Sequence, residues 1–144
     1  MQASLRKPVL QQAGLFNAQD NLAFLASPPP TVGTTQTPTL TTGWTNTPGA
    51  NPAGFRTEEN GATVRILGSI TSSSSGNPSP TVVFTLPAGY RPSQSLAFAF
   101  AGSGAAPATG LFNINSSGQV NVLTSWTGVG AVSLEGITFQ IPQS

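Results

Sequence analysis

Glycine and proline interrupt this sequence at short intervals, which limits every regular element to a few residues. The chain holds 16 glycines and 13 prolines among 144 residues. Proline fixes φ and cannot donate to a backbone ladder, whereas glycine adopts turn conformations that other residues avoid. The glycines have no three-residue period, which excludes a collagen helix. Apolar residues make up 38% of the chain, too many for a wholly disordered protein. We therefore expect one domain of short β-strands separated by turns.

Between these interruptions, apolar residues alternate with polar or small ones, the period of a half-buried strand. In the clearest run, residues 62–71, Val64, Ile66, Gly68 and Ile70 share one face. A slip in the alternation near Glu135 indicates a bulge in the last run. Strands are expected at 54–58, 62–71, 81–86, 95–101, 109–115, 119–124 and 132–141. Seven or eight strands spaced about 8–14 residues apart predict an all-β fold, an antiparallel jelly-roll-like β-sandwich, over residues 53–144.

Residues 1–26 and 27–52 differ from this strand-rich part. The first segment carries large apolar side chains but no run long enough for a stable isolated helix. We expect an attachment arm that buries them against another polypeptide, at about 1.5–3 kcal/mol each. The second segment, rich in proline and threonine, is expected to be an extended linker, whose Trp44 clamps the arm to the domain or to a neighbouring subunit. The predicted attachment residues are Leu10, Leu15, Phe16, Leu22, Phe24, Leu25 and Trp44.

Charged side chains are scarce, which narrows the possible partners. Five basic and four acidic residues give a formal net charge of +1, whereas about a quarter of residues are charged in ordinary soluble domains. Such a chain lacks the basic surface that nucleic acids or anionic membranes attract. It also lacks an apolar run of about 18 residues, and its first residues do not form a signal peptide. We expect no nucleic-acid partner and no membrane insertion.

The residues needed for most enzyme chemistry are missing. The chain contains neither cysteine nor histidine, which excludes Ser–His–Asp and Cys–His catalysis and the usual zinc ligands. Glu58 and Glu59 are adjacent, so on a strand they would point to opposite faces, unlike a glycosidase pair. No calcium-binding loop or phosphate loop appears. We expect no enzymatic activity, no metal and no cofactor.

One contiguous segment, Phe84-Thr85-Leu86-Pro87-Ala88-Gly89-Tyr90-Arg91-Pro92, is the most specific motif of the chain. Its leucine is expected to end a strand, its first proline to stop the ladder and its glycine to permit a turn. The tyrosine ring should pack over a sheet edge, and the arginine should form a structural ion pair rather than bind a ligand. The motif residues with these structural roles are Leu86, Pro87, Gly89, Tyr90, Arg91 and Pro92.

Together with shorter pieces in a fixed order, this motif resembles the C-terminal domains of tailed-bacteriophage tail-fibre and minor tail proteins. The resemblance covers residues 40–141, about two thirds of the chain. It implies a virion protein, assembled in the host cytoplasm, that forms homotrimers at the host-facing end of a fibre. The other pieces are Gly43-Trp44, Ala53-Gly54-Phe55-Arg56, Val64-Arg65-Ile66 with Gly68, Gly118-Gln119-Val120 and Ser133-Leu134-Glu135-Gly136-Ile137-Thr138-Phe139.

The leading hypothesis is a short tail or baseplate fibre module. Its arm would dock onto other virion proteins, and its β-sandwich would contact a glycan or protein on the host surface. Only about 40 residues precede the resembling part, which favours a short appendage and leaves open a capsid decoration (cement) protein whose arm staples capsomers. A secreted carbohydrate-binding module would need an export signal.

Trp126, flanked by Thr124 and Thr127, is the candidate receptor contact, because an aromatic ring among hydroxyls suits stacking on a sugar or an interface anchor. The alternative, which we favour, is that Trp126 plugs one end of the sandwich.

Overall fold

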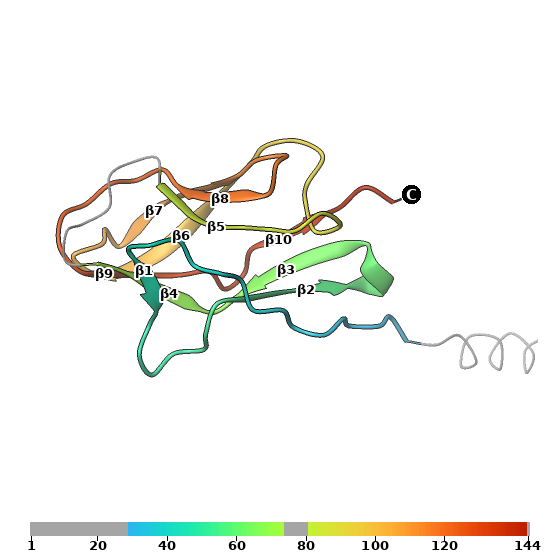
Figure 1. Ribbon diagram of the computed structural model, residues 1–144, viewed down its shortest axis with the longest axis horizontal. Helices are drawn as coiled ribbons and strands as arrows, with labels where there is room; N and C mark the ends of the chain where they lie inside the picture. The colour runs from blue at the N-terminus through green and yellow to red at the C-terminus, as the bar shows by residue number, and fades with distance from the viewer. Residues whose placement is uncertain (1–28, 74–80, 144) are drawn as a thin grey trace, which may run out of the picture. The chain divides into compact units, whose positions relative to one another are not determined.

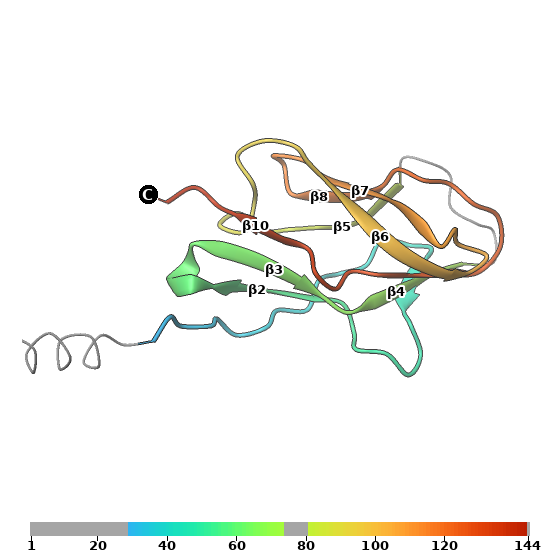
Figure 2. The ribbon, with the colours of Figure 1, turned by 180° about the vertical axis from the view of Figure 1, so that it is seen from behind.

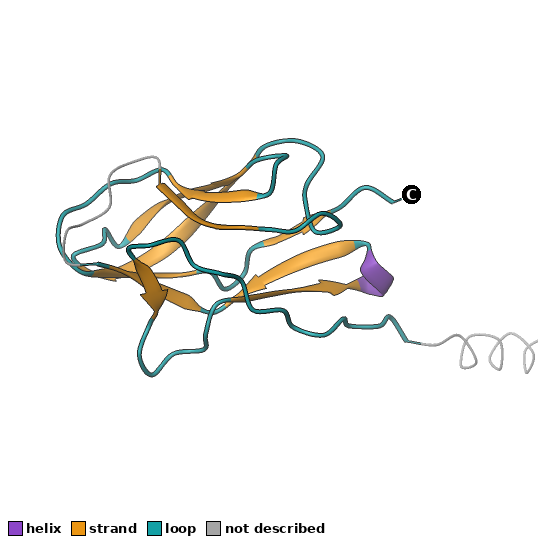
Figure 3. Cartoon of the chain, viewed as in Figure 1, coloured by secondary structure: helices purple, strands orange, loops and turns teal. Residues whose placement is uncertain are grey.

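The computed structural model describes residues 29–73 and 81–143. The chain divides into two compact units, residues 1–30 and 31–144, and the second unit carries the fold (Figures 1 and 3). Its described part forms ten strands and one short 3-10 turn, η1 (Glu59–Gly61). The strands are β1 (Trp44–Asn46), β2 (Gly54–Glu58), β3 (Thr63–Leu67), β4 (Ser69–Ser72), β5 (Thr81–Thr85), β6 (Leu96–Gly104), β7 (Thr109–Ile114), β8 (Gln119–Val122), β9 (Gly130–Ser133) and β10 (Thr138–Gln140).

The strands form two antiparallel sheets, as the sequence predicts. The larger sheet has the order β1-β4-β9-β6-β7-β8-β5, and the smaller has the order β10-β3-β2. The backbone N–H of Thr41, just before β1, donates to the carbonyl of Val83 in β5 at 2.7 Å. Because β1 and β5 are the two ends of the larger sheet, this bond nearly closes it into a barrel. The antiparallel β-sandwich is confirmed, with a larger sheet that curls back on itself.

The chain passes from one sheet to the other between β3 and β4 and again between β9 and β10, and these two passages lie side by side. Gly68 separates β3 from β4, so the expected strand 62–71 is two strands in different sheets. The expected bulge near Glu135 is likewise the passage from β9 to β10. These crossings are bonded to each other, because Leu134 N–H donates to the Gly68 carbonyl at 2.8 Å and Gly68 N–H donates to Glu135 Oε1 at 3.0 Å. Gly68 has φ +96°, and a Cβ there would overlap the Pro52 carbonyl, so only glycine fits.

The core follows the alternation read from the sequence. Val64, Ile66 and Ile70 are fully buried, which confirms the expected inner face of residues 62–71. Side chains of both sheets join them, because alternate strand residues point to the same face. The other large, fully buried side chains are Phe84, Leu86, Phe112, Ile114, Val83, Val120, Val122, Val132 and Leu134.

The expected linker at 27–52 is wrong for residues 31–52, which belong to the folded unit. Gln36 N–H donates to the Phe55 carbonyl and Phe55 N–H donates back to the Gln36 carbonyl, at 2.8 and 3.0 Å. This segment therefore covers the open edge of β2, a position that otherwise invites pairing with other chains. Farther along, Trp44–Asn46 pairs with β4 as an edge strand of the larger sheet. The predicted arm, residues 1–26, lies outside the described residues.

Candidate functional site

An open groove lies where the two sheets diverge, between β6 and β10. The first part of β6, Leu96–Ala101, pairs with β7, and only Gly102–Gly104 pairs with β9. After β9 the chain turns away to form β10 at the edge of the smaller sheet (Figure 2). Among the described strands, none pairs with Leu96–Ala101 on the side of β9. The gap between these two strand edges holds a volume of about 420 Å³.

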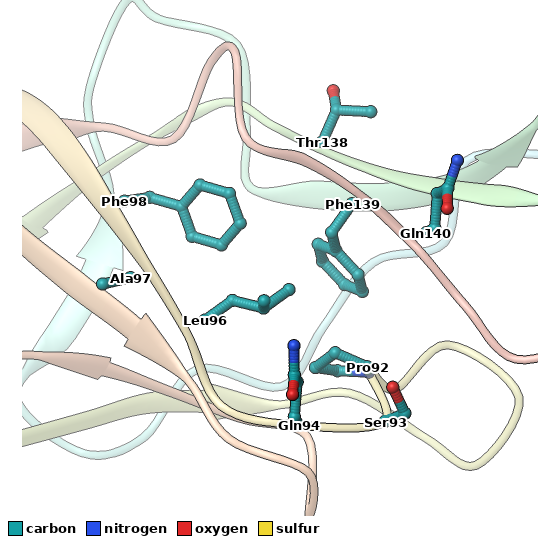
Figure 4. A pocket seen from close by; sticks show the side chains of 9 residues that line it. All are labelled: Pro92, Ser93, Gln94, Leu96, Ala97, Phe98, Thr138, Phe139 and Gln140. Carbon is teal, nitrogen blue, oxygen red and sulfur yellow. The ribbon is translucent and has the colours of Figure 1, made fainter.

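The groove has an apolar floor and a polar rim, in which Gln94 borders the floor whereas Thr138 and Gln140 point away from it, on the opposite face of β10 from Phe139 (Figure 4). Leu96 and Phe98 are half-buried, whereas Phe139 is buried. The rings of Phe98 and Phe139 lie 6.3 Å apart between centroids, tilted by 44°. The nine lining residues are Pro92, Ser93, Gln94, Leu96, Ala97, Phe98, Thr138, Phe139 and Gln140.

The polar side chains of the rim have unused hydrogen-bonding capacity. Ser93, Gln94, Thr138 and Gln140 are exposed, and their side chains form no hydrogen bond within the part of the chain that the structure describes. A glutamine amide offers two donor hydrogens and an acceptor oxygen, and a hydroxyl offers both functions. The rim can therefore bind a ligand without breaking an existing contact.

The groove carries no charge, because all nine lining residues are uncharged. The nearest arginine by strand register is Arg65, which lies opposite Thr138. On the smaller sheet, Glu58 Oε1 lies 2.9 Å from Arg56 Nη2 and 3.9 Å from Arg65 Nη1. The two arginines share this one carboxylate, so the cluster keeps a net charge of +1, and none of its three residues lines the groove. The groove itself can offer only hydrogen bonds and apolar contact.

The Phe84–Pro92 motif leads into the groove at its last residue and forms the expected turn. Leu86 is fully buried, Gly89 has φ +93° and Tyr90 N–H donates to the Pro87 carbonyl at 3.2 Å, which closes the expected turn. The Tyr90 ring packs edge-on against Phe55 with centroids 4.9 Å apart. The chain then reaches Pro92, which lines the groove.

Arg91 is structural, although not through the expected ion pair. Its Nε donates to the Leu86 carbonyl at 2.8 Å, and no carboxylate pairs with it among the described residues. Gly118 makes room for this contact, because a Cβ there would lie 2.6 Å from the Leu86 oxygen and 2.9 Å from Arg91 Nε. The arginine therefore secures the end of β5, since its guanidinium donates to a carbonyl that has left the ladder.

Trp126 is not a receptor contact, because its side chain is buried with 9% of its surface exposed. Its ring packs edge-on against Trp44 and Phe100, with centroids 5.9 and 6.2 Å apart, and its Nε1 donates to Ser72 Oγ at 3.2 Å. The expectation that it plugs the sandwich is correct. Thr124 is half-buried and Thr127 exposed, and neither lines the groove.

Trp44 is likewise inside its own domain, with 5% of its surface exposed. It therefore clamps residues 31–52 to the sheet and has no free face for another subunit. The six other predicted attachment residues, between Leu10 and Leu25, lie outside the described residues.

Sequence reasoning did not identify the groove. Its floor residues belong to the predicted strand 95–101, whose alternation indicates an inward face without revealing that the face is left partly open. Its rim combines Gln94 with Gln140, from segments that only the fold brings together. The available signal was the exposed polar sequence Ser93-Gln94-Ser95 directly after the most specific motif.

Metal sites and membrane-spanning helices have no candidate in the described ranges, 29–73 and 81–143. No group of three or more His, Cys, Asp or Glu side chains is placed there to hold a metal ion. In the same ranges, no helix is long and apolar enough to span a membrane.

Comparison with known proteins gives one informative likeness. No family model matches the sequence, and no curated protein matches it. Among solved structures, the crystal structure of the receptor binding protein (gp15) of Listeria phage PSA is similar, with a TM-score of 0.60 and 19% sequence identity. The match covers 94% of this chain and 79% of that chain. The two chains share a fold. At this identity the likeness establishes the β-sandwich and does not by itself establish the function.

Proposed function

We propose that this protein is a bacteriophage virion protein that attaches the particle to its host. It would be a short tail or baseplate fibre module, docking through residues 1–26 and contacting the host surface with its β-sandwich. The observation that carries the proposal is the fold shared, over 94% of this chain, with a protein described as a phage receptor binding protein. The ordered motifs at residues 40–141 support the same assignment independently, because they were found in the sequence alone.

The groove supports a binding role rather than catalysis. General acid–base chemistry needs a titratable side chain within hydrogen-bond reach of the substrate, and the nine groove residues include none. The proposal is therefore a non-enzymatic attachment protein without metal or cofactor.

We further propose that the protein acts as a homotrimer whose copies meet on the outer face of β6 and β7. Leu111 and Leu123 are 48% and 38% exposed there, and Leu111 lies opposite Ala99. Ala97, Ala99 and Ala101 are exposed along β6, and such small side chains allow close approach. Two copies could bury this uncharged face without the cost of desolvating charges.

Leu111→Glu tests this interface. We expect the variant to shift from trimer to monomer in light scattering, because three copies would have to bury a carboxylate without a partner. Val32→Glu, at a residue that is 58% exposed outside this face, is the matched control and should stay trimeric. A monomeric parent protein would contradict the proposal.

The attachment role is tested by competition and by location. Purified protein should reduce adsorption of the parent phage to its host, and labelled antibody should mark the tail at low copy number. High copy number over the capsid, with no effect on adsorption, would instead support the decoration alternative. Protein that neither competes nor occurs in virions would refute both.

A further inference from the structure

Phe98 is only half-buried, although its side chain lies on the inward face of β6. Leu96, Phe98 and Phe100 alternate along β6 and share one face. Phe100 is 4% exposed and packs on Phe112 with ring centroids 5.0 Å apart. Phe98 and Leu96 remain half-buried, because β9 leaves β6 after Gly102 and β10 joins the other sheet. The divergence of the strands thus presents part of an aromatic ring inside the groove.

Gln94 complements that ring. It reaches the groove from the loop before β6, whereas Gln140 points to the opposite face of β10 from Phe139 (Figure 4). A sugar ring has one face of C–H bonds and a circumference of hydroxyls, so it matches an apolar floor flanked by an amide. Ligand sites commonly combine such a floor with a few polar groups in volumes of about 300–1,000 Å³, and this groove measures about 420 Å³.

The absence of charge selects among saccharides. A carboxylate or phosphate entering the groove would lose hydration without gaining a cationic partner, since none of the lining residues is charged. Neutral hydroxyls exchange their water hydrogen bonds for those of Gln94 and Ser93. An extended peptide could pair with the unpaired edge of Leu96–Ala101, but such backbone pairing would leave the Gln94 amide unused.

We propose that the groove between β6 and β10 binds an uncharged saccharide, with Phe98 beneath the sugar ring and Gln94 bonded to its hydroxyls. This inference deepens the proposed function and rests on it for its biological setting. Binding energy at such a site depends on both surfaces, because apolar contact supplies affinity and the buried hydroxyls require partners.

The test titrates the full-length protein with methyl glucoside, methyl galactoside and N-acetylglucosamine, followed by ¹⁵N NMR of the glutamine side-chain amides. We expect at least one probe to shift the Gln94 amide with a Kd of about 1 mM, a weak affinity of about −4 kcal/mol. Gln94→Ala should weaken binding by about tenfold. Gln36→Ala, an exposed glutamine outside the groove, should leave the Kd unchanged.

Several outcomes would overturn the inference. These are saturation without a shift at the Gln94 amide, equal affinity for the charged N-acetylneuraminic acid, or shifts produced only by an extended peptide. Phe98→Ala is the second variant, for the floor. If Gln94→Ala keeps the parental unfolding midpoint, any loss of binding is assigned to the Gln94 amide, even where Phe98→Ala fails to fold.

Adsorption competition distinguishes a failure of the saccharide inference from a failure of the attachment role. If the protein blocks phage adsorption but no sugar binds in the groove, the saccharide inference fails and the attachment role stands. If sugars bind in the groove but the protein neither blocks adsorption nor occurs in virions, the attachment role fails and the groove assignment stands. Blocking that is lost in Gln94→Ala would support both.

Discussion

Replacing Ser72 with alanine should destabilise this fold more than any other loss of a single hydroxyl that we can identify. Ser72 lies in β4 with 3% of its surface exposed. Its Oγ accepts hydrogen bonds from Trp126 Nε1 at 3.2 Å and from the Gly130 N–H at 3.1 Å. Its single proton goes to the carbonyl of Gly128 or Gly130, at 3.3 and 3.2 Å. Both lone pairs and the proton are thereby used.

The magnitude follows from the groups that would be left without partners. Ser72→Ala creates no clash, but two buried N–H donors lose their acceptor, at about 1–3 kcal/mol each. We expect a loss of about 2–6 kcal/mol in the free energy of unfolding, a large fraction of the about 5–15 kcal/mol of a typical domain. For a folded unit of this size, the melting temperature should fall by about 10 °C or more.

Urea unfolding of the parent and variant, followed by tryptophan fluorescence, measures this loss. Ser116→Ala, at an exposed turn position, is the control and should stay within about 0.5 kcal/mol of the parent. Trp126→Phe keeps an aromatic plug but removes one donor, so Ser72→Ala should cost about 1 kcal/mol less in that background. Fluorescence is then read from Trp44. A cost below about 0.5 kcal/mol, or the same cost in both backgrounds, would refute the reasoning.

Three further changes test other parts of the structure. Gly68→Ala should lower the free energy of unfolding in urea by at least about 2 kcal/mol, because alanine is strained at this positive φ and its Cβ would overlap Pro52. The control Gly136→Ala, with φ +88° and open space around the Cβ, should lose only the energy of the backbone strain. Equal losses in the two variants would contradict the predicted clash. Glu135→Ala should lower the free energy of unfolding by about 1 kcal/mol, because it removes the acceptor of the Gly68 N–H. Glu135→Gln keeps an acceptor oxygen and should retain most of that stability. Identical losses in the two variants would show that this hydrogen bond does not contribute. Deletion of residues 1–26 should leave a soluble trimer that no longer enters virions in a complementation assay; normal incorporation would exclude the arm as the attachment segment.

Much of the fold could be predicted from local patterns. The expected runs at 54–58, 81–86, 109–115 and 119–124 correspond closely to β2, β5, β7 and β8, because turn residues mark strand ends and alternation marks the buried face. The pattern could not reveal that 62–71 and 132–141 each change sheets. A slip in alternation looks the same whether the chain bulges within one sheet or passes to another.

The site was less predictable than the fold. Trp126 could be read from its neighbours as an exposed anchor or as a core plug, and only the packing of Trp44 and Phe100 against it decides the matter. Residues 31–52 have the composition of a linker, yet they form strand β1 and cover the edge of β2. Composition describes a segment in isolation, whereas an unpaired strand edge supplies hydrogen-bond partners from elsewhere in the chain.

By itself, the sequence determined the short strands, the buried face of most of them and the scarcity of charged side chains. These properties depend on residue type and on spacing within a few positions. Only the tertiary structure decided that Phe98 borders an open groove while Phe100, two residues later on the same face, is sealed in the core. Burial depends on which strand arrives alongside, and β9 reaches Gly102 but no farther.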